Sequence, residues 1–291
     1  MKMEKILIGV DGGGSRLRIV VENESGDLLF CKEGGAANIR TSVKSSWEAI
    51  LQGLQEGFAE IGKAFPEQQV EYHASFGLAG LEYEPALESF LEYSHPFHSL
   101  IVTSDARIAC LGAHGKKSGA IIIVGTGIIG YQQEHDQITR VGGWGFPHDD
   151  EGSGAQLGMQ AVRALFKAFD GRIEHSHLTL ALQKKWPTPD MLLTHFHHAD
   201  AKKFAHLAPL VFDAAHNQDQ LALTLVERTC HAIDEISLTL VKKQLDVDQP
   251  LPLALVGGLA KPLWPFLQPE FKNRLHQPLM TPEKGALLLI K

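Results

Sequence analysis

The segment Ile6–Ser15 limits what this chain can fold into more than any other stretch. An apolar run ends at Asp11, three glycines follow, and Ser15 closes the segment. Ile19–Val21 then restores the apolar pattern, which predicts a strand, a tight glycine turn and a second strand. Glycines lack a Cβ, so their backbone N–H groups can approach an anion closely. The segment therefore predicts a phosphate-binding turn with Asp11 placed to hold hydrated Mg²⁺, and an ordinary hairpin turn is the alternative.

Two better-known phosphate loops do not fit this segment. A P-loop requires a lysine directly after its last glycine, and Ser15 stands there instead. A dinucleotide-binding fingerprint requires a helix after its glycines, whereas Ile19–Val21 is typical of a strand. Neither of these nucleotide-binding motifs is therefore expected.

Composition and charge narrow the class of protein. With 291 residues, of which 44% are hydrophobic and 21% charged, the chain can form two modest globular domains. A net charge of −7 argues against a nucleic-acid partner. Three cysteines lie far apart and fit no metal or disulfide spacing, which predicts a cytoplasmic protein. Asp11 breaks the first apolar run, and the most apolar stretch, Ala120–Tyr131, is short, so neither a signal peptide nor a membrane span is expected.

The order of apolar segments starts again halfway along the chain. Apolar spacing predicts strands at 69–76, 100–103, 120–124, 128–133, 138–141 and 251–256, and helices over 47–61, 84–93, 106–114, 151–169 and most of 190–245. The strand, glycine turn and strand at 120–133 repeat the pattern that opens the chain. We therefore expect two related domains that meet near Gly115–Gly119. Thr281 and Pro282 begin a last helix, which we expect to fold back onto the first domain.

Polar or glycine clusters follow the apolar strands, and in open α/β sheets ligands bind at such strand ends. Asp105 follows one strand directly and precedes a helix. A carboxylate there can accept the proton of a hydroxyl that attacks phosphorus, or it can cap the helix. Gly125–Gly130 matches Gly-x-Gly-x-x-Gly, but a hairpin follows it, so we interpret Gly125–Gly127 as a second phosphate turn in which the Thr126 hydroxyl faces phosphate.

Two further segments carry functional side chains. Gly142–Gly154 combines glycines, aromatic residues and acids, which suits binding of a neutral sugar, whereas Asp150 and Glu151 could instead serve the next helix as cap and dipole residues. His195–His198 invites a metal site, but no carboxylate or cysteine nearby completes one. A polar surface turn is the preferred interpretation of the histidines.

Taken together, these motifs resemble the BadF/BadG/BcrA/BcrD ATPase family of the sugar kinase/actin/Hsp70 superfamily, over nearly the whole chain. The resemblance implies an α/β fold of two ribonuclease H-like (actin-like ATPase) domains with a cleft between them. The domains would be 1–115 joined by the C-terminal helix 281–291, and 116–280. The resemblance implies the following site residues: Gly12, Gly13, Gly14, Ser15, Gly125, Thr126, Gly127, Gly257 and Gly258 for ATP; Asp11 for Mg²⁺; Asn38, Gly80, Asp105 and Asp150 for a sugar; and Asp105 as catalytic base.

Within the family, the segments 94–97, 110–114 and 152–155 look closest to bacterial glucosamine kinases. Three positions depart from the family pattern. Ser15 replaces a threonine, Ile128 stands where a serine often follows Gly-Thr-Gly, and Arg40 stands where mammalian-type enzymes carry an aromatic residue.

The function that the resemblance implies is phosphorylation of the 6-hydroxyl of an amino sugar by ATP. Glucosamine is the expected substrate and N-acetylglucosamine the alternative, with homodimerisation left open. Another class with this fold, the BadF-type activators of acyl-CoA dehydratases, needs cluster-binding cysteines in the central region, and none lies between Cys110 and Cys230. A sugar-sensing repressor would need a DNA-binding segment before the first strand. A binding module without activity stays an alternative.

Overall fold

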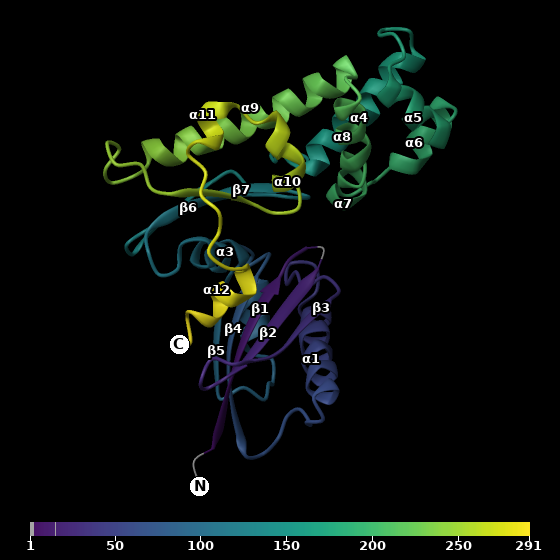
Figure 1. Cartoon of the computed structure of the whole chain (residues 1–291). Helices are drawn as coiled ribbons and strands as arrows, with labels where there is room; N and C mark the ends of the chain where they lie inside the picture. Colours follow the sequence, from purple (N-terminus) through teal and green to yellow (C-terminus); the bar gives the residue numbers. More distant parts are fainter. Residues whose placement is uncertain (1–2, 15) are drawn as a thin grey trace. The chain divides into compact units, whose positions relative to one another are not determined.

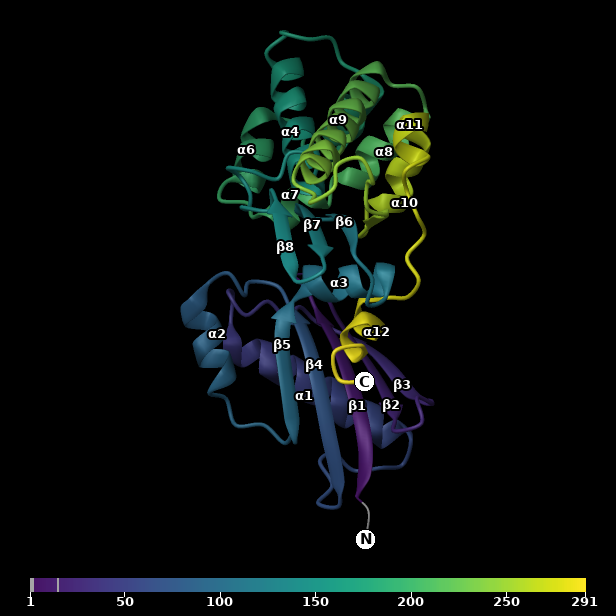
Figure 2. The same cartoon turned by 90° about the vertical axis from the view of Figure 1, so that its left-hand side faces the viewer.

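The computed structural model describes residues 3–14 and 16–291. The chain forms two compact units (Figures 1 and 2). The first comprises residues up to Gly119 together with Pro278–Lys291, and the second comprises Ala120–Gln277. Each unit has its own sheet and its own hydrophobic core. The mixed α/β architecture expected from the sequence is therefore confirmed.

The first unit is built on a five-stranded sheet in the order β3-β2-β1-β4-β5. Its strands are β1 (Glu4–Gly12), β2 (Leu17–Asn23), β3 (Leu28–Gly34), β4 (Val70–Leu78) and β5 (Ser99–Ser104). β1, β4 and β5 run parallel, while β2 is antiparallel to both β1 and β3. The carboxyl ends of the three parallel strands therefore lie at one edge of the sheet.

Helices cover both faces of this sheet. They are α1 (Val43–Glu60), α2 (Glu84–Leu91), α3 (Asp105–His114) and α12 (Pro282–Leu287). Ile8 and Val10 of β1 belong to the same hydrophobic core as Trp47 of α1. Gly9 between them faces the other way, because a Cβ there would lie 2.2 Å from the Glu283 carbonyl oxygen of α12. α12 therefore packs on β1 and α3 (Figure 2), which carry Asp11 and Asp105.

The second unit repeats the beginning of this topology. Its sheet has the order β8-β7-β6-β9, with β6 (Gly119–Val124), β7 (Ile128–Glu134), β8 (Gln137–Val141) and β9 (Leu253–Val256). In both sheets, three consecutive strands lie side by side and a later strand pairs in parallel with the first. The glycine turns after β1 and after β6 therefore occupy equivalent places.

The rest of the second unit is mostly helical. The helices are α4 (Gly154–Phe169), α5 (His177–Lys185), α6 (Pro189–Phe196), α7 (Ala201–Ala205), α8 (Ala208–His216), α9 (Gln220–Lys242), α10 (Ala260–Leu263), the 3₁₀ helix η1 (Trp264–Phe266) and α11 (Pro269–Lys272). Asp219 caps α9 and joins it to α5, because its carboxylate accepts from the N–H groups of Ala222 and Leu178 at 2.9 and 2.8 Å. Among the helices of residues 3–14 and 16–291, none combines the length and apolar character that crossing a bilayer requires.

Candidate active site

Strand register brings several of the predicted residues to one edge of the first sheet. Gly12 at the end of β1 pairs with Leu78 at the end of β4, and Leu78 pairs with Ser104 at the end of β5. The Ala79 N–H donates to the Gly12 carbonyl at 2.8 Å, which continues the ladder past the strand ends. Asp11, Gly80 and Asp105 therefore lie on neighbouring strand ends.

Asp11 lies in an acidic and largely buried setting. Its side chain is only 17% exposed, and its Oδ2 lies 3.6 Å from a terminal guanidinium nitrogen of Arg18. Burial and, to a lesser extent, the Asp105 carboxylate raise the pKa of Asp11, Arg18 opposes the rise, and the net result is a pKa of about 7. Two carboxyl groups this close together favour a bound cation, because a cation stabilises both charges at once.

Asp105 is the first residue of α3 and does not cap it. Ser104 is the N-cap, because its hydroxyl oxygen accepts from the Arg107 N–H at 3.1 Å. One carboxylate oxygen of Asp105 accepts from the N–H of Ala106 at 2.8 Å. The alternative of Asp105 as the helix cap is therefore wrong, and its carboxylate is part-buried at the sheet edge.

Asn38 and Gly80 contact each other at this edge. Asn38 forms an isolated parallel bridge with Ala79, and its Oδ1 accepts from the Arg40 N–H at 3.0 Å. Gly80 has a φ of 90°, and a Cβ there would lie 2.5 Å from Asn38 Oδ1. A glycine is therefore required at position 80 by its backbone conformation and by the Asn38 carboxamide.

The first glycine turn contains glycines of two kinds. A Cβ at Gly12 would lie 2.5 Å from a Leu78 methyl group, so packing inside the unit excludes a side chain there. Among the described residues, a Cβ at Gly13 or Gly14 would meet other atoms only at 3.5 and 3.9 Å, so these residues leave the space beside both glycines open. The Gly13 N–H donates to the Arg16 carbonyl at 3.0 Å, so this amide is used within the turn and does not face an anion. Ser15 lies outside the described residues.

In the second unit, the equivalent turn is fixed to the start of α4. The Gly125 N–H donates to the Gly127 carbonyl at 2.9 Å, which closes the turn. The Gly154 and Ala155 N–H groups donate to the carbonyls of Gly125 and Thr126 at 2.8 and 3.1 Å. These bonds hold the part-exposed Thr126 in a defined position, while a Cβ at Gly125 would have no atom of another described residue, apart from its chain neighbours, within 4 Å.

Asp150 packs against this turn and does not cap α4. The cap is Ser153, whose hydroxyl accepts from the Gln156 N–H, so the helix begins at Gly154 and later than expected. Asp150 is buried, with a φ of 76°, and its Oδ1 accepts from the Ile128 N–H at 3.3 Å. Burial raises the pKa of Asp150, and the bond from the Ile128 N–H counteracts part of that rise. The cap interpretation of Asp150 is therefore wrong.

Ile128 and the two glycines after β9 are the remaining predicted positions of the second unit. The Ile128 side chain is buried in the core, so it offers no polar contact where family members often carry serine. Gly257 has a φ of 98°, and a Cβ there would lie 2.3 Å from the Val124 carbonyl oxygen. In the part of the chain that the structure describes, a Cβ at Gly258 would have no atom within 4 Å apart from those of its chain neighbours. The end of β9 therefore adds an open glycine beside the end of β6.

The loop before Asp150 is held by polar contacts. Arg140 donates from Nε to the Gly142 carbonyl at 3.0 Å, and its guanidinium lies 4.9 Å from the centre of the Trp144 ring. The Trp144 N–H donates to Asp149 Oδ2 at 2.8 Å. Trp144 is nevertheless 77% exposed. The loop thus presents an ordered aromatic side chain to solvent.

The structure therefore gathers the predicted residues into two groups. The first unit contains one group: Asp11, the open glycines Gly13 and Gly14, Asn38, Gly80 and Asp105. Gly125–Gly127, Asp150, Gly257 and Gly258 lie together in the second. Arg18 was not identified from the sequence as a site residue. The signal that could have identified it is the hairpin register, because a tight turn after Gly12 pairs Arg18 with Asp11.

Mg²⁺ fits the carboxylates of the first unit, and the glycine turn of each unit by itself leaves space for phosphate. Mg²⁺ is usually held by one or two carboxylates with phosphate oxygens and water, and Asp11 with nearby Asp105 provides that donor set. No cluster of three or more His, Cys, Asp or Glu side chains suited to a metal occurs in the described part of the chain, and this includes His195–His198. The open space beside Gly13, Gly14, Gly125 and Gly258 suits phosphate groups.

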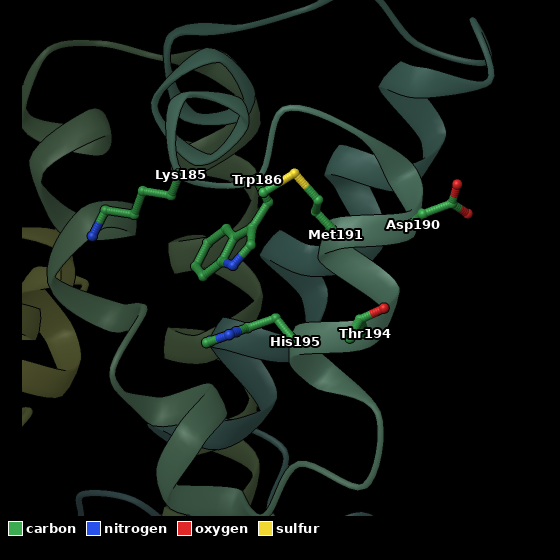
Figure 3. A pocket seen from close by; sticks show the side chains of 6 residues that line it. All are labelled: Lys185, Trp186, Asp190, Met191, Thr194 and His195. Atoms are coloured by element: carbon green, nitrogen blue, oxygen red, sulfur yellow. The ribbon is translucent and has the colours of Figure 1, made fainter.

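A pocket of about 440 Å³ lies elsewhere, on α5 and α6 (Figure 3). Its lining is Lys185, Trp186, Asp190, Met191, Thr194 and His195. The His195 ring lies 4.9 Å from the Trp186 ring, and burial lowers the pKa of His195. None of the predicted site residues lines this pocket.

Comparison with known proteins identifies the family. The profile of the BadF/BadG/BcrA/BcrD ATPase family matches residues 8–289. The chain belongs to this family. A glucosamine kinase from Vibrio cholerae is 29% identical over 97% of this chain and 94% of its own length.

Solved structures agree with the family assignment. The crystal structure of a candidate N-acetylglucosamine kinase from Chromobacterium violaceum has 34% identity and a TM-score of 0.92, with both chains covered completely. A glucokinase of the ROK family from Streptomyces griseus, solved with glucose and AMPPNP, shares the fold at 16% identity and a TM-score of 0.54, over 97% of each chain. This member of the BadF/BadG/BcrA/BcrD family therefore has the actin-like ATPase fold of sugar kinases.

Proposed function

We propose that this family member is a kinase that transfers a phosphoryl group from ATP to the 6-hydroxyl of an amino sugar. Glucosamine is the proposed preferred substrate, and N-acetylglucosamine is the second. The similarity to the Vibrio cholerae glucosamine kinase supports the first, and the similarity to the Chromobacterium violaceum structure supports the second. Use of Mg²⁺, a cytoplasmic location and a homodimer belong to the same proposal.

The observation that carries the proposal is the shared sheet edge of the first unit. Strand pairing brings Asp11 and Asp105 to the same edge of the sheet, and the Asp105 carboxylate contributes to the raised pKa of Asp11. Asn38 and Gly80 lie at the same edge. Sugar phosphorylation needs a carboxylate base, a carboxylate for the divalent cation and polar groups for hydroxyls within one small region.

The proposed mechanism divides the work among these residues. Asp105 accepts the proton of the sugar's 6-hydroxyl as the hydroxyl oxygen attacks the γ-phosphorus of ATP and ADP leaves. Asp11 would hold Mg²⁺, and the glycines Gly13 and Gly14 of the first unit would leave room for phosphates. When bound, ATP supplies the phosphoryl group and Mg²⁺ neutralises its charge. Because Ser104 caps α3, the Asp105 carboxylate does not have to serve the helix as its cap.

Substrate choice is proposed to depend on Asn38 and Asp105 in the first unit, and Asp150 in the second unit stays a predicted sugar-binding residue. Carboxylates and a carboxamide accept hydrogen bonds from sugar hydroxyls, and they attract an ammonium group at C2. This charge complementarity is the reason that glucosamine is ranked above N-acetylglucosamine.

The direct test is product analysis. The purified protein is incubated with ATP, Mg²⁺ and glucosamine, and the product is examined by ³¹P and ¹³C NMR. We expect ADP and a phosphate ester at C6. ADP release that does not depend on any sugar, with no phosphate ester formed, would contradict the proposal and favour an ATPase of the activator class.

A further inference from the structure

Three charged side chains form a row across the first sheet, and this row ends at Asp11. Asp11 of β1 pairs directly with Arg18 of β2, and Arg18 pairs directly with Glu33 of β3. Directly opposed residues of an antiparallel pair project to the same face with close Cβ atoms. Arg18 uses different nitrogens for the two acids, one terminal nitrogen at 3.6 Å from Asp11 and Nε at 3.5 Å from Glu33.

Exposure increases along the row from Asp11 to Glu33. The side chains of Asp11, Arg18 and Glu33 are 17%, 34% and 71% exposed. Charge interactions weaken with solvent contact, so the inner contact of Arg18 with Asp11 is stronger than its outer contact with Glu33. Glu33 still offsets the positive charge of Arg18, which limits the repulsion of a divalent cation.

Two other acids act on Asp11. Asp105 and Glu283 both act on Asp11 electrostatically, and Glu283 Oε2 is buried without a hydrogen-bond partner among the described residues. Repulsion from these carboxylates would turn the Asp11 side chain away from them, since rotation of a carboxylate about χ2 is soft. The contact of Arg18 with Oδ2 opposes that rotation.

We propose that Arg18 is a positioning residue that fixes the Asp11 carboxylate for Mg²⁺. It acts through Asp11 and does not itself touch substrate. This inference rests on the proposed function only in taking Asp11 as the Mg²⁺ ligand.

The test measures metal binding without turnover. Mn²⁺ replaces Mg²⁺, ADP is present, and bound Mn²⁺ is followed by electron paramagnetic resonance. The variants are Arg18→Ala and Arg18→Lys. The matched control is Lys32→Ala, which removes a cation and its ion pair to Glu60 from the neighbouring strand. Sugar affinity is measured for each variant by calorimetry.

We expect Arg18→Ala to raise the Kd for Mn²⁺ about fivefold or more, a cost of about 1 kcal/mol, with sugar affinity unchanged. Arg18→Lys restores part of the loss because it keeps the charge, and Lys32→Ala binds Mn²⁺ like the wild type. An Mn²⁺ affinity of folded Arg18→Ala equal to or above that of the wild type would overturn the proposal. Loss of ADP affinity in metal-free buffer would overturn it too, because Arg18 would then contact phosphate directly.

These outcomes are separate from those of the proposed function. Wild-type protein that binds Mn²⁺ with ADP but phosphorylates no amino sugar would contradict the proposed function alone. The comparison of Arg18 variants would still decide whether Arg18 positions Asp11.

Discussion

A valine at Gly13 separates the nucleotide-binding role of the first glycine turn from its structural role. Among the described residues, the nearest neighbour of a Cβ at Gly13 would be the Arg16 carbonyl oxygen at 3.5 Å, and Gly13 is not among the glycines with positive φ. Replacing a glycine whose conformation suits other residues changes stability by only about 0.4–1 kcal/mol, and often upward. We therefore expect the melting temperature of Gly13→Val to stay within about 4 °C of wild type.

Nucleotide affinity should respond very differently. The side chain of Gly13→Val would fill the open space that we assign to phosphate. We expect ATP affinity to fall at least ~100-fold, a loss of about 2.8 kcal/mol, with sugar binding still detectable. Isothermal titration calorimetry with ATP and with glucosamine gives both affinities, and differential scanning calorimetry gives the melting temperature.

Gly12→Ala is the matched comparison. Its Cβ would lie 2.5 Å from a Leu78 methyl group and 3.0 Å from the Ala37 carbonyl oxygen, so overpacking should cost ~1–3 kcal/mol of stability. Unchanged ATP affinity in folded Gly13→Val would place the nucleotide elsewhere and refute the reasoning. Unfolding of Gly13→Val would show that the space beside Gly13 is not open.

Two further predictions concern single carboxylates. Asp105→Asn should lower kcat by ~10²–10⁴ with the fold intact and sugar affinity less affected, because the amide still hydrogen-bonds; near-normal turnover would remove Asp105 as the base. Asp219→Asn should cost ~1–3 kcal/mol of stability at pH 7, measured by urea unfolding, because one of the N–H groups of Ala222 and Leu178 loses its acceptor. Burial alone would raise the pKa of Asp219, but these N–H donors outweigh it and lower the pKa below 3.8. The stability that this carboxylate contributes is therefore complete above pH 3.8 and is lost as pH falls through the folded pKa. Equal acid sensitivity of the wild type and Asp219→Asn would contradict this role of the Asp219 carboxylate.

The sequence predicted the ends of several strands, because β1, β5 and β6 are short apolar runs that stop beside a polar or glycine residue. It did not predict β3, whose apolar residues are followed by Lys32 and Glu33, and β4 continues to Leu78, past the predicted end at 76. Parallel pairing then follows from alternating strands and helices, and it brings Asp11 and Asp105 to one edge. The sequence also separated the glycine turn from a dinucleotide-binding loop, since β2 follows it.

Hydrogen-bond partners could not be predicted in the same way. Several neighbouring residues can cap a helix, and Ser104 and Ser153 took the place that Asp105 and Asp150 could have filled. The backbone of Asp150 instead adopts a positive φ and its carboxylate binds the Ile128 N–H, a contact across 22 positions. Such a contact depends on tertiary packing, and no local pattern indicates it.

The difference between the two kinds of glycine was also hidden in the sequence. Gly12 and Gly13 are adjacent and look equivalent, yet one is needed for packing and the other borders open space. Arg18 was missed because its link to Asp11 depends on strand register, which the turn length sets.

The most direct test of the central claim is kcat/KM for glucosamine, N-acetylglucosamine and glucose, measured with coupled detection of ADP. The account predicts glucosamine first, N-acetylglucosamine second and glucose poorest, with glucose lower than glucosamine by roughly 10²-fold or more because it lacks the C2 nitrogen. A tenfold or greater preference for N-acetylglucosamine would contradict the ranking by charge and leave the kinase in place. Absence of phosphorylation of either hexosamine would contradict the account as a whole.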